Sequence, residues 1–500
     1  MKKPVPIQVK SLVATTPVMR AVQWLSWAFL IIMAVRTPGD PDMGWHLQNG
    51  NYILQHLHLP PGDIYSWTMP GYPWVPHEWA SDVMMAAIYH FSGLTGLVIF
   101  FTIIIGLLLW VTSRIYRTNW FIQIMVAATT LFIAWSVIGA RPQMFTLLGT
   151  ALVLWILFRW REQPNSKLIW WLLPIFWIWA NLHGGFLTGG IVAAIFVVGE
   201  CLRHLLLGRH RPSKDLVPLL SWQAIRQLII IGGISFIATF LTPNLWRSYQ
   251  ELYQTLSDTK ILSQIAEWLR VTLSQPSSYN AGILGLWLVG LMWFNKWKFD
   301  TTKLILALVV LGFALTAWRH LPLFAIAAAP LLAEQLTLLL SGWKMTEWPW
   351  AWCALLLLIV TGFDANRQYL SVVPTLNDFD RYAAQLDLPR QAALLYLKQH
   401  PPSRMFNEYN WGGYLIWQLP EVKVFIDGRM AIWETNNLKI FDDFQSILSL
   451  DSREASFYLD KWQVNTIFIR ANRPLDLYLQ NDSQWRLDYH DELSAIWTRV

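Results

Sequence analysis

Long apolar runs recur along most of this 500-residue chain and restrict the folds that it can adopt. A bilayer core is crossed by about 20 mostly apolar helical residues. Eleven runs approach this length, at residues 21–36, 92–113, 120–140, 143–158, 168–182, 185–202, 223–242, 281–295, 303–318, 322–340 and 349–363. The sequence therefore predicts a polytopic α-helical membrane protein with about eleven transmembrane helices.

The composition indicates the same class. Hydrophobic residues make up 54% of the chain and charged residues only 14%, and its 32 Trp suit side chains that anchor helices at membrane interfaces. The net charge of +6 needs no nucleic-acid partner, because basic loops facing an anionic leaflet account for it. Cys201 and Cys353 lie inside apolar runs and support neither a disulfide framework nor a Cys-based metal site.

Basic residues concentrate in alternate loops, as the positive-inside rule requires of cytoplasmic segments. They are Lys2, Lys3, Lys10, Arg114, Arg117, Arg159, Arg161, Lys167, Arg203, Arg209, Arg211, Lys214, Lys296, Lys298, Lys303 and Lys344. The pattern predicts a cytoplasmic N-terminus and, with an odd number of spans, an extracytoplasmic C-terminal region. We therefore expect a transmembrane domain at 1–363, with large outer loops at 37–82 and 243–280, and an extracytoplasmic domain at 364–500.

Beyond residue 364 the composition becomes that of a soluble domain. Residues 380–400 are predicted as a helix, and 404–408, 422–427 and 464–471 as strands. Strands that alternate with helices indicate a small α/β domain. The turns Asn410–Tyr414 and Phe425–Arg429 are rich in Gly and aromatic residues. They either stack on sugars or peptides or are ordinary turns with core aromatics.

The first outer loop concentrates ionisable side chains beside the membrane, where each is costly unless it is paired, hydrated or functional. It contains Asp40, Asp42, His46, Asp63, His77 and Glu78. Residues 42–58 have a rough amphipathic pattern, which predicts a helix lying flat at the interface. Asp42 is then either its N-cap or a site residue. Glu78 is likewise either a first-turn acid of the next helix or part of a site.

Further polar residues fall on the same predicted outer face: Arg141, Asn181, His183, Arg319 and His320. A phosphate or carboxylate would be a suitable partner for the arginines. Alternatively, the arginines snorkel to lipid phosphate, and His183 interacts with the end of a helix. The second outer loop is predicted to form one or two amphipathic helices, which either roof the site or serve as scaffold.

Several motifs together resemble known proteins: DPDMGWHL, PHEW, ARPQMF, NLHGG, WRHLPLF, NWGGYLIW and VFIDGR. They are similar to a group of bacterial membrane proteins labelled putative glycosyltransferases. This group resembles the C-type (GT-C) integral-membrane glycosyltransferases, which include protein O-mannosyltransferases and lipid A aminoarabinose transferases. The resemblance covers nearly the whole chain and implies a multi-pass protein of the bacterial inner membrane.

The resemblance also implies a chemistry, namely inverting transfer of a hexose or pentose from a polyprenyl-phosphate donor to an acceptor hydroxyl on the extracytoplasmic face. The family's catalytic base matches Asp42, with Asp40 as the rival, because the motif here is Asp-Pro-Asp rather than two adjacent acids. Glu78 is a further catalytic candidate. Arg319, His320 and Arg141 are expected to bind the donor phosphate. His46, His77, His183 and Asn181 are expected either to face the acceptor or to support the catalytic groups from behind.

The acceptor is expected to be a glycan, a lipid or a protein, and membrane lipids surround the chain. No cofactor is certain, but a divalent cation held by Asp and His side chains is a candidate. Two other classes stay open. One is a transporter or flippase of lipid-linked saccharide, which the absence of a visible inverted repeat disfavours. The other is a non-catalytic membrane assembly protein.

Overall fold

The computed structural model describes residues 16–207, 219–258, 262–263, 265–272, 276–341, 347–435, 438–449 and 452–500. Seven of the predicted cytoplasmic basic residues lie outside these ranges: Lys2, Lys3, Lys10, Arg209, Arg211, Lys214 and Lys344. The chain forms two compact units. We call Met1–Arg36, Ile99–Leu245 and Leu262–Gln368 the helical unit, and Thr37–Val98, Trp246–Ile261 and Tyr369–Val500 the loop unit.

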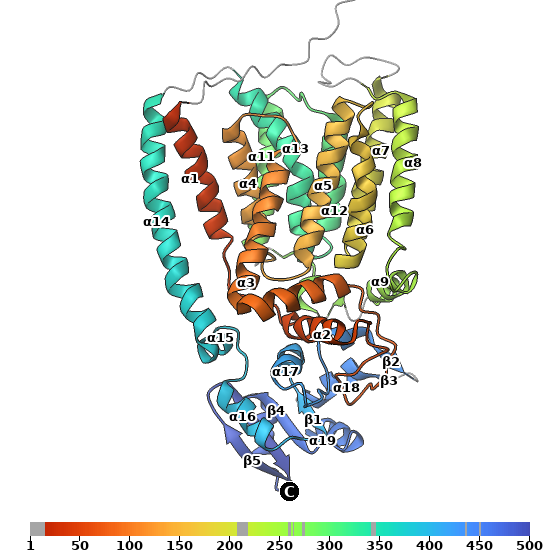
Figure 1. Cartoon of the computed structure of the whole chain (residues 1–500), viewed down its shortest axis with the longest axis vertical. Coiled ribbons are helices and arrows are strands. Elements are labelled where there is room, and N and C mark those ends of the chain that lie inside the picture. The colour runs from red at the N-terminus through yellow and green to blue at the C-terminus, as the bar shows by residue number, and fades with distance from the viewer. Residues whose placement is uncertain are drawn as a thin grey trace, which may run out of the picture. The chain divides into compact units, whose positions relative to one another are not determined.

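The helical unit consists of helices that run alongside one another (Figure 1). It contains α1 (Pro17–Met33), α4 (Trp120–Ala134), α5 (Gln143–Glu162), η1 (Lys167–Trp171), α6 (Leu172–Leu182), α7 (Phe186–Leu207), α8 (Trp222–Ala238), η2 (Ala266–Trp268), α11 (Pro276–Phe294), α12 (Thr301–Ala314), η3 (Trp318–His320) and α13 (Leu321–Leu340). The C-terminal part of α3 (Trp79–Ser113) and the N-terminal part of α14 (Glu347–Asn377) complete it.

Each predicted membrane segment overlaps one of these helices. Among the described residues, four helices are long and apolar enough to cross a bilayer: Trp79–Ser113, Gln143–Glu162, Phe186–Leu205 and Trp318–Leu340. Six further apolar helices are shorter. Large apolar side chains such as Ile237, Leu286 and Trp293 are exposed on this unit, as expected of surfaces that contact lipid. The chain is therefore rich in membrane-type helices, and eleven crossings stay a prediction.

Buried ion pairs join four helices of the helical unit. Arg161 of α5 donates to Asp300, the N-cap of α12, over 2.7 Å, and its guanidinium lies 3.0 Å from Glu200 of α7. Lys303 of α12 donates to Glu334 of α13 over 2.5 Å. All five side chains are nearly inaccessible. Removing one partner would leave an uncompensated buried charge, so these pairs fix the helices relative to one another.

The loop unit is built from segments far apart in sequence. It contains α2 (Met43–His56), the N-terminal part of α3, α9 (Arg247–Ser257), the C-terminal part of α14, α15 (Phe379–Gln385), α16 (Gln391–Gln399), β1 (Met405–Asn407), η4 (Tyr409–Trp411), α17 (Gly412–Gln418), η5 (Gly428–Ile432), β2 (Glu434–Thr435), β3 (Leu438–Lys439), α18 (Ile440–Ile447), α19 (Ser452–Lys461), β4 (Thr466–Arg470), α20 (Pro474–Leu479), β5 (Trp485–His490) and β6 (Ser494–Arg499).

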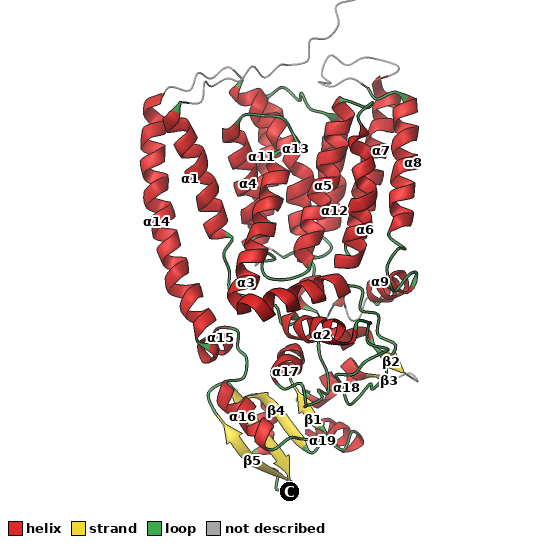
Figure 2. Ribbon diagram, in the orientation of Figure 1, coloured by secondary structure: helices red, strands yellow, loops and turns green. Residues whose placement is uncertain are grey.

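A four-stranded sheet with the order β1-β4-β6-β5 lies in the C-terminal part of this unit. β1 pairs parallel to β4, whereas β6 pairs antiparallel to both β4 and β5. Figure 2 shows α16 beside β5, where Tyr396 donates to Asp488 over 2.8 Å. Helices and strands thus alternate in residues 405–499, whereas a separate C-terminal α/β domain and its extracytoplasmic location stay predictions.

Two local predictions differ from the structure. Residues 422–427 form only an isolated parallel bridge, between Val424 and Ser66, because the first outer loop supplies the partner backbone. The single helix predicted at 380–400 is two helices, since Asp387 adopts a left-handed φ of 57° and Pro389 follows it. The helix predicted at 42–58 is present as α2, with the side chains of its first turn buried, and its flat orientation at the interface stays a prediction.

α3 starts in the loop unit and ends in the helical unit. Its helical geometry breaks at Gly93, where φ is 59° and ψ is −156°. Only glycine adopts such a backbone readily. The apolar segment predicted at 92–113 therefore corresponds to the part of α3 that follows this break.

Candidate functional site

The two acids of the Asp-Pro-Asp motif lie together at the start of α2. The backbone N–H of Asp42 donates to Oδ1 of Asp40 over 3.0 Å. Asp42 occupies the N-cap position, yet its side chain makes no capping hydrogen bond. Burial, and then the neighbouring charge of Asp40, raise the pKa of Asp42 to about 7. A carboxylate in this position is a proton acceptor suited to neutral pH.

Glycines of α2 and of residues 412–428 allow these two parts of the backbone to approach each other closely at the start of α2. A Cβ atom added to Gly44 would overlap the carbonyl oxygen of Gly413. A Cβ atom added to Gly428 would overlap the carboxylate of Asp42. The motifs NWGGY and FIDGR, predicted as turns with or without a ligand role, therefore border the Asp-Pro-Asp motif within the loop unit.

A second polar group lies one turn further along α2. Nδ1 of His46 is 2.5 Å from Oδ1 of Asp82 in the first turn of α3, and Nδ2 of Asn49 donates to the other oxygen of Asp82 over 2.6 Å. Nε2 of His46 is 3.5 Å from Glu78. Burial by itself lowers the pKa of His46, but the carboxylates of Asp82 and Glu78 outweigh it and raise that pKa to about 9.

Glu78 is nearly buried, and it lies between two imidazoles. Its Oε1 is 3.8 Å from Nε2 of His77. Burial raises the pKa of Glu78, although the charges of His46 and His77 oppose the shift. Asp40, Asp42, His46, His77 and Glu78 are therefore brought together in the loop unit.

The side chain of Arg429 links η5 to the first outer loop through ion pairs. Its guanidinium donates to both oxygens of Asp427, over 2.8 and 2.6 Å, and lies 3.0 Å from Asp63. It also stacks over Trp74, 4.6 Å from the ring centroid. Burial opposes the charged form, but the two carboxylates raise the pKa of Arg429. This cation, paired with two carboxylates, stabilises the backbone beside Gly428.

The predicted phosphate-binding residues lie in the helical unit. Nη1 of Arg141 donates to Oε1 of Glu267 over 2.6 Å, and Nη1 of Arg319 is 3.5 Å from Oε2 of the same side chain. The guanidinium of Arg319 also lies over Trp268, at 4.5 Å. His320 stacks on Phe313 with a centroid distance of 4.2 Å. Two arginines thus share one carboxylate, the kind of partner expected for them.

Asn181 and His183 lie at the end of α6. Nδ1 of His183 is 2.7 Å from the hydroxyl of Thr146 and accepts the N–H of Gly185 over 2.9 Å. Asn181 donates to the carbonyl oxygen of Trp177 over 2.9 Å. These bonds hold the turn between α6 and α7. An acceptor-side role for both residues stays a prediction.

No family model matches the sequence, and no curated protein matches it. Solved structures of an oligosaccharyltransferase from Archaeoglobus fulgidus do match. The apo form superposes with a TM-score of 0.56 and 10% identity, covering 90% of this chain and 69% of that chain. A complex with an inhibitory peptide and a dolichol-phosphate gives 0.57 and 11%, covering 96% and 74%. The chain has the fold of an archaeal oligosaccharyltransferase.

A third oligosaccharyltransferase structure, tethered with an acceptor peptide containing the NVT sequon, has a TM-score of 0.54 and 11% identity over 96% of this chain and 74% of that chain. At such identities the likeness concerns the fold. It agrees with the integral-membrane glycosyltransferase fold that the motifs predict. The narrower grouping with protein O-mannosyltransferases and aminoarabinose transferases stays a prediction.

Three residues of these clusters were not singled out by sequence reasoning, namely Asn49, Asp82 and Glu267. Asp427 and Arg429 were named only as parts of the turn Phe425–Arg429, without the ion pair that joins them. Asn49 follows His46 by three residues, so helical spacing could have placed the two on one face. Glu267 lies in the predicted second outer loop, and its pairing with two distant arginines has no local signal.

Among the described residues, no group of three or more His, Cys, Asp or Glu side chains could hold a metal ion. The divalent cation that the Asp and His side chains of the first outer loop suggested stays a prediction. No step below uses it.

Proposed function

We propose that the chain is a membrane glycosyltransferase that moves a sugar from a polyprenyl-phosphate donor to an acceptor hydroxyl on the extracytoplasmic face. The oligosaccharyltransferase fold supports this class. The observation that carries the proposal is the carboxylate of Asp42, which lies at the start of α2 beside Gly428 and has a pKa of about 7. A group with this pKa is half ionised at neutral pH and therefore accepts and releases protons readily.

In the proposed reaction, Asp42 accepts the proton of the acceptor hydroxyl as its oxygen attacks the anomeric carbon. The bond from that carbon to the lipid phosphate breaks, and the phosphate leaves with the bonding electron pair. One displacement of this kind inverts the anomeric centre. General-base catalysis contributes about 10²–10⁴-fold to such rates. Asp40 acts through its charge, because it raises the pKa of Asp42.

The buried His46 cation opposes Asp40, because its charge lowers the pKa of Asp42. Asp82 and Glu78 hold that cation in place. In this proposal His46 and Glu78 are positioning residues, which set the charge around the base without touching the sugar.

Arg141 and Arg319 are proposed to bind the donor phosphate. Their guanidinium groups already share one carboxylate, that of Glu267, and a phosphate offers oxygens with similar geometry. One similar structure is in complex with a dolichol-phosphate, which supports a lipid phosphate as the ligand class. Another is tethered with an acceptor peptide, so protein acceptors are the first class to test.

The experiment uses the full chain in proteoliposomes with a series of polyprenyl-phosphate hexoses and pentoses, and measures released polyprenyl phosphate. Asp42→Asn keeps the size of the side chain and removes the base, so release should fall by about 10²–10⁴-fold. Asp40→Asn should reduce release less. His56→Gln, at an exposed position on the same helix, is the matched control. Full release by Asp42→Asn would overturn the proposal, as would sugar-lipid movement across the bilayer without release.

A further inference from the structure

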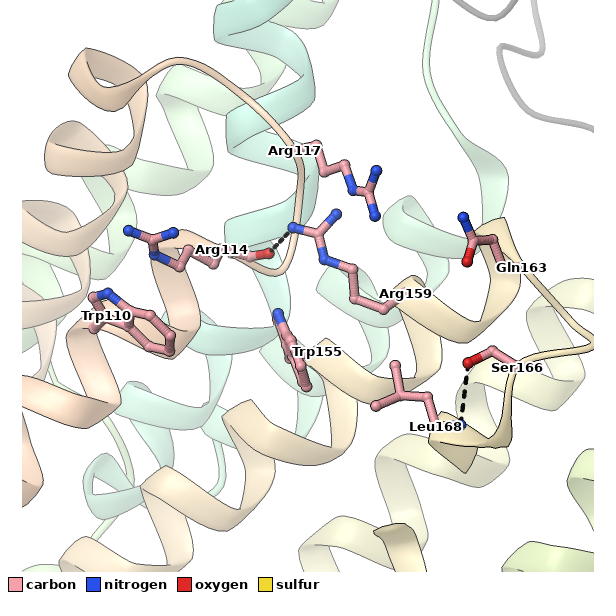
Figure 3. Close-up of a pocket in the computed structure, with 8 residues that line it drawn as sticks. All are labelled: Trp110, Arg114, Arg117, Trp155, Arg159, Gln163, Ser166 and Leu168. Atoms are coloured by element: carbon pink, nitrogen blue, oxygen red, sulfur yellow. Dashed lines mark hydrogen bonds between the residues drawn. The ribbon is translucent and has the colours of Figure 1, made fainter. Parts of the chain in front are cut away.

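A cavity of about 390 Å³ opens in the helical unit where α3 and α5 end (Figure 3). It is separate from the residues discussed above. The cavity is lined by Trp110, Arg114, Arg117, Trp155, Arg159, Gln163, Ser166 and Leu168. Its size is within the range of small-ligand sites.

Three arginines line the cavity, and one carboxylate opposes them. Nε of Arg117 and Nη1 of Arg159 lie 3.0 and 3.4 Å from the same oxygen of Glu162. Nη2 of Arg159 donates to the carbonyl oxygen of Arg114 over 2.6 Å. Two positive charges therefore remain uncompensated within this group, which favours an anionic ligand.

Stacking holds the Arg114 side chain at the wall of the cavity. Its guanidinium lies over the ring of Trp110 at 4.5 Å, and both residues line the cavity. The charge of Arg114 therefore adds to those of Arg117 and Arg159, which favours an anionic ligand here.

An exposed apolar stripe on α3 leads away from the cavity. Ile103, Leu107 and Trp110 are exposed by 56%, 45% and 44%, and their spacing places them on the helix face that carries Arg114. A free phosphate ion would gain nothing by contacting this apolar stripe. An acyl chain would cover it, and Trp110 is the residue type found where lipid tails meet headgroups.

We propose that this cavity binds the phosphate headgroup of an anionic membrane phospholipid, with an acyl chain along Ile103, Leu107 and Trp110. The basic-loop pattern predicts that this end of the helices is cytoplasmic, where anionic lipids attract such side chains. The site is independent of the proposed sugar transfer.

The test titrates the purified full chain in detergent micelles with short-chain phosphatidylglycerol, phosphatidylcholine and glycerol phosphate, and measures bound ligand by native mass spectrometry. Arg114→Gln and Arg117→Gln should each weaken phosphatidylglycerol about fivefold, which corresponds to one basic residue near an anionic lipid. Glu162→Gln should tighten it by a similar factor, because it frees two guanidinium groups. A variant that merely misfolds cannot produce this gain.

Arg226→Gln removes an equal charge at an exposed position on α8 and should leave binding unchanged. Leu107→Gln should weaken phosphatidylglycerol but not glycerol phosphate, since only the lipid has an acyl chain. The inference fails if phosphatidylcholine binds as tightly, if Arg226→Gln has the effect of Arg114→Gln, or if Glu162→Gln brings no gain. It also fails if glycerol phosphate binds as tightly as the lipid.

Discussion

His46 and Asp82 form a buried pair in the loop unit, with Nδ1 of His46 2.5 Å from Oδ1 of Asp82. The two residues belong to different helices, so this contact fixes α2 against the start of α3. Asn49 bonds the second oxygen of Asp82. Burial alone disfavours a charged imidazole. His46 is therefore charged only because Asp82 and Glu78 stabilise its cation, while Asn49 hydrogen-bonds to Asp82.

This pair should make stability depend on pH. The folded pKa of His46, about 9, is above its ordinary value of 6.5. Its contribution, about 3 kcal/mol by linkage, is fully present below pH 6.5 and is lost as pH rises through 9. Thermal unfolding of the purified chain should therefore show a larger deficit for His46→Gln at pH 6 than at pH 9.5. His56→Gln should show no such difference, and an equal deficit at both pH values would refute the assignment.

The rate of sugar transfer should increase with pH through about 7, because Asp42 acts in its ionised form and its pKa lies there. Asp40→Asn removes a negative charge that raises this pKa, so the rising limb should move to lower pH. The check is a pH profile of kcat/KM for both proteins. An unmoved limb in Asp40→Asn would mean that another group titrates.

Gly428→Ala and Gly44→Ala should separate activity from folding. The added methyl group at Gly428 meets the carboxylate of Asp42, a side chain that can move aside. Transfer should fall at least tenfold while unfolding changes by less than about 1 kcal/mol. At Gly44 it meets the backbone of Gly413, and overpacking of this kind costs about 1–3 kcal/mol. Transfer assays and thermal unfolding on both variants measure the difference.

Arg319→Gln should raise KM for the lipid donor about tenfold, since a charge-assisted hydrogen bond contributes about 1.5–3 kcal/mol. Glu267→Gln should lower this KM, because the phosphate would no longer compete with a carboxylate for Arg141 and Arg319. If the arginines serve only to hold Glu267, both substitutions will instead impair the protein alike. Donor titrations at fixed acceptor distinguish these results.

The membrane-type helices could be predicted from the sequence because apolar length is a local property. The predicted segments overlap α1, α3–α8 and α11–α14. The start of α2 was likewise placed at Asp42, a residue type that favours helix starts. The positions of the helices and the ionisable residues of the first outer loop can thus be predicted from the sequence.

The contacts of the candidate site could not be predicted from the sequence, because they join distant parts of the chain. Gly428 lies against the carboxylate of Asp42, although nearly the whole sequence separates the two residues. Val424 pairs with Ser66 instead of entering the predicted sheet. Residues 422–427 resemble a strand locally, but the outer loop supplies their hydrogen-bond partners. Glu267 was missed for the same reason, because its partners Arg141 and Arg319 lie in the α4–α5 and α12–α13 connections rather than beside it in sequence.

The discontinuous make-up of the loop unit has a consequence for biogenesis. Its earliest segment, which carries Asp40 and Asp42, needs Asp427–Arg429 before its neighbourhood is complete. During translation the first outer loop therefore lacks these contacts until the ribosome has made most of the chain. A nascent product truncated before residue 427 would contain Asp40 and Asp42 but not the residues that border Asp42 in the folded loop unit.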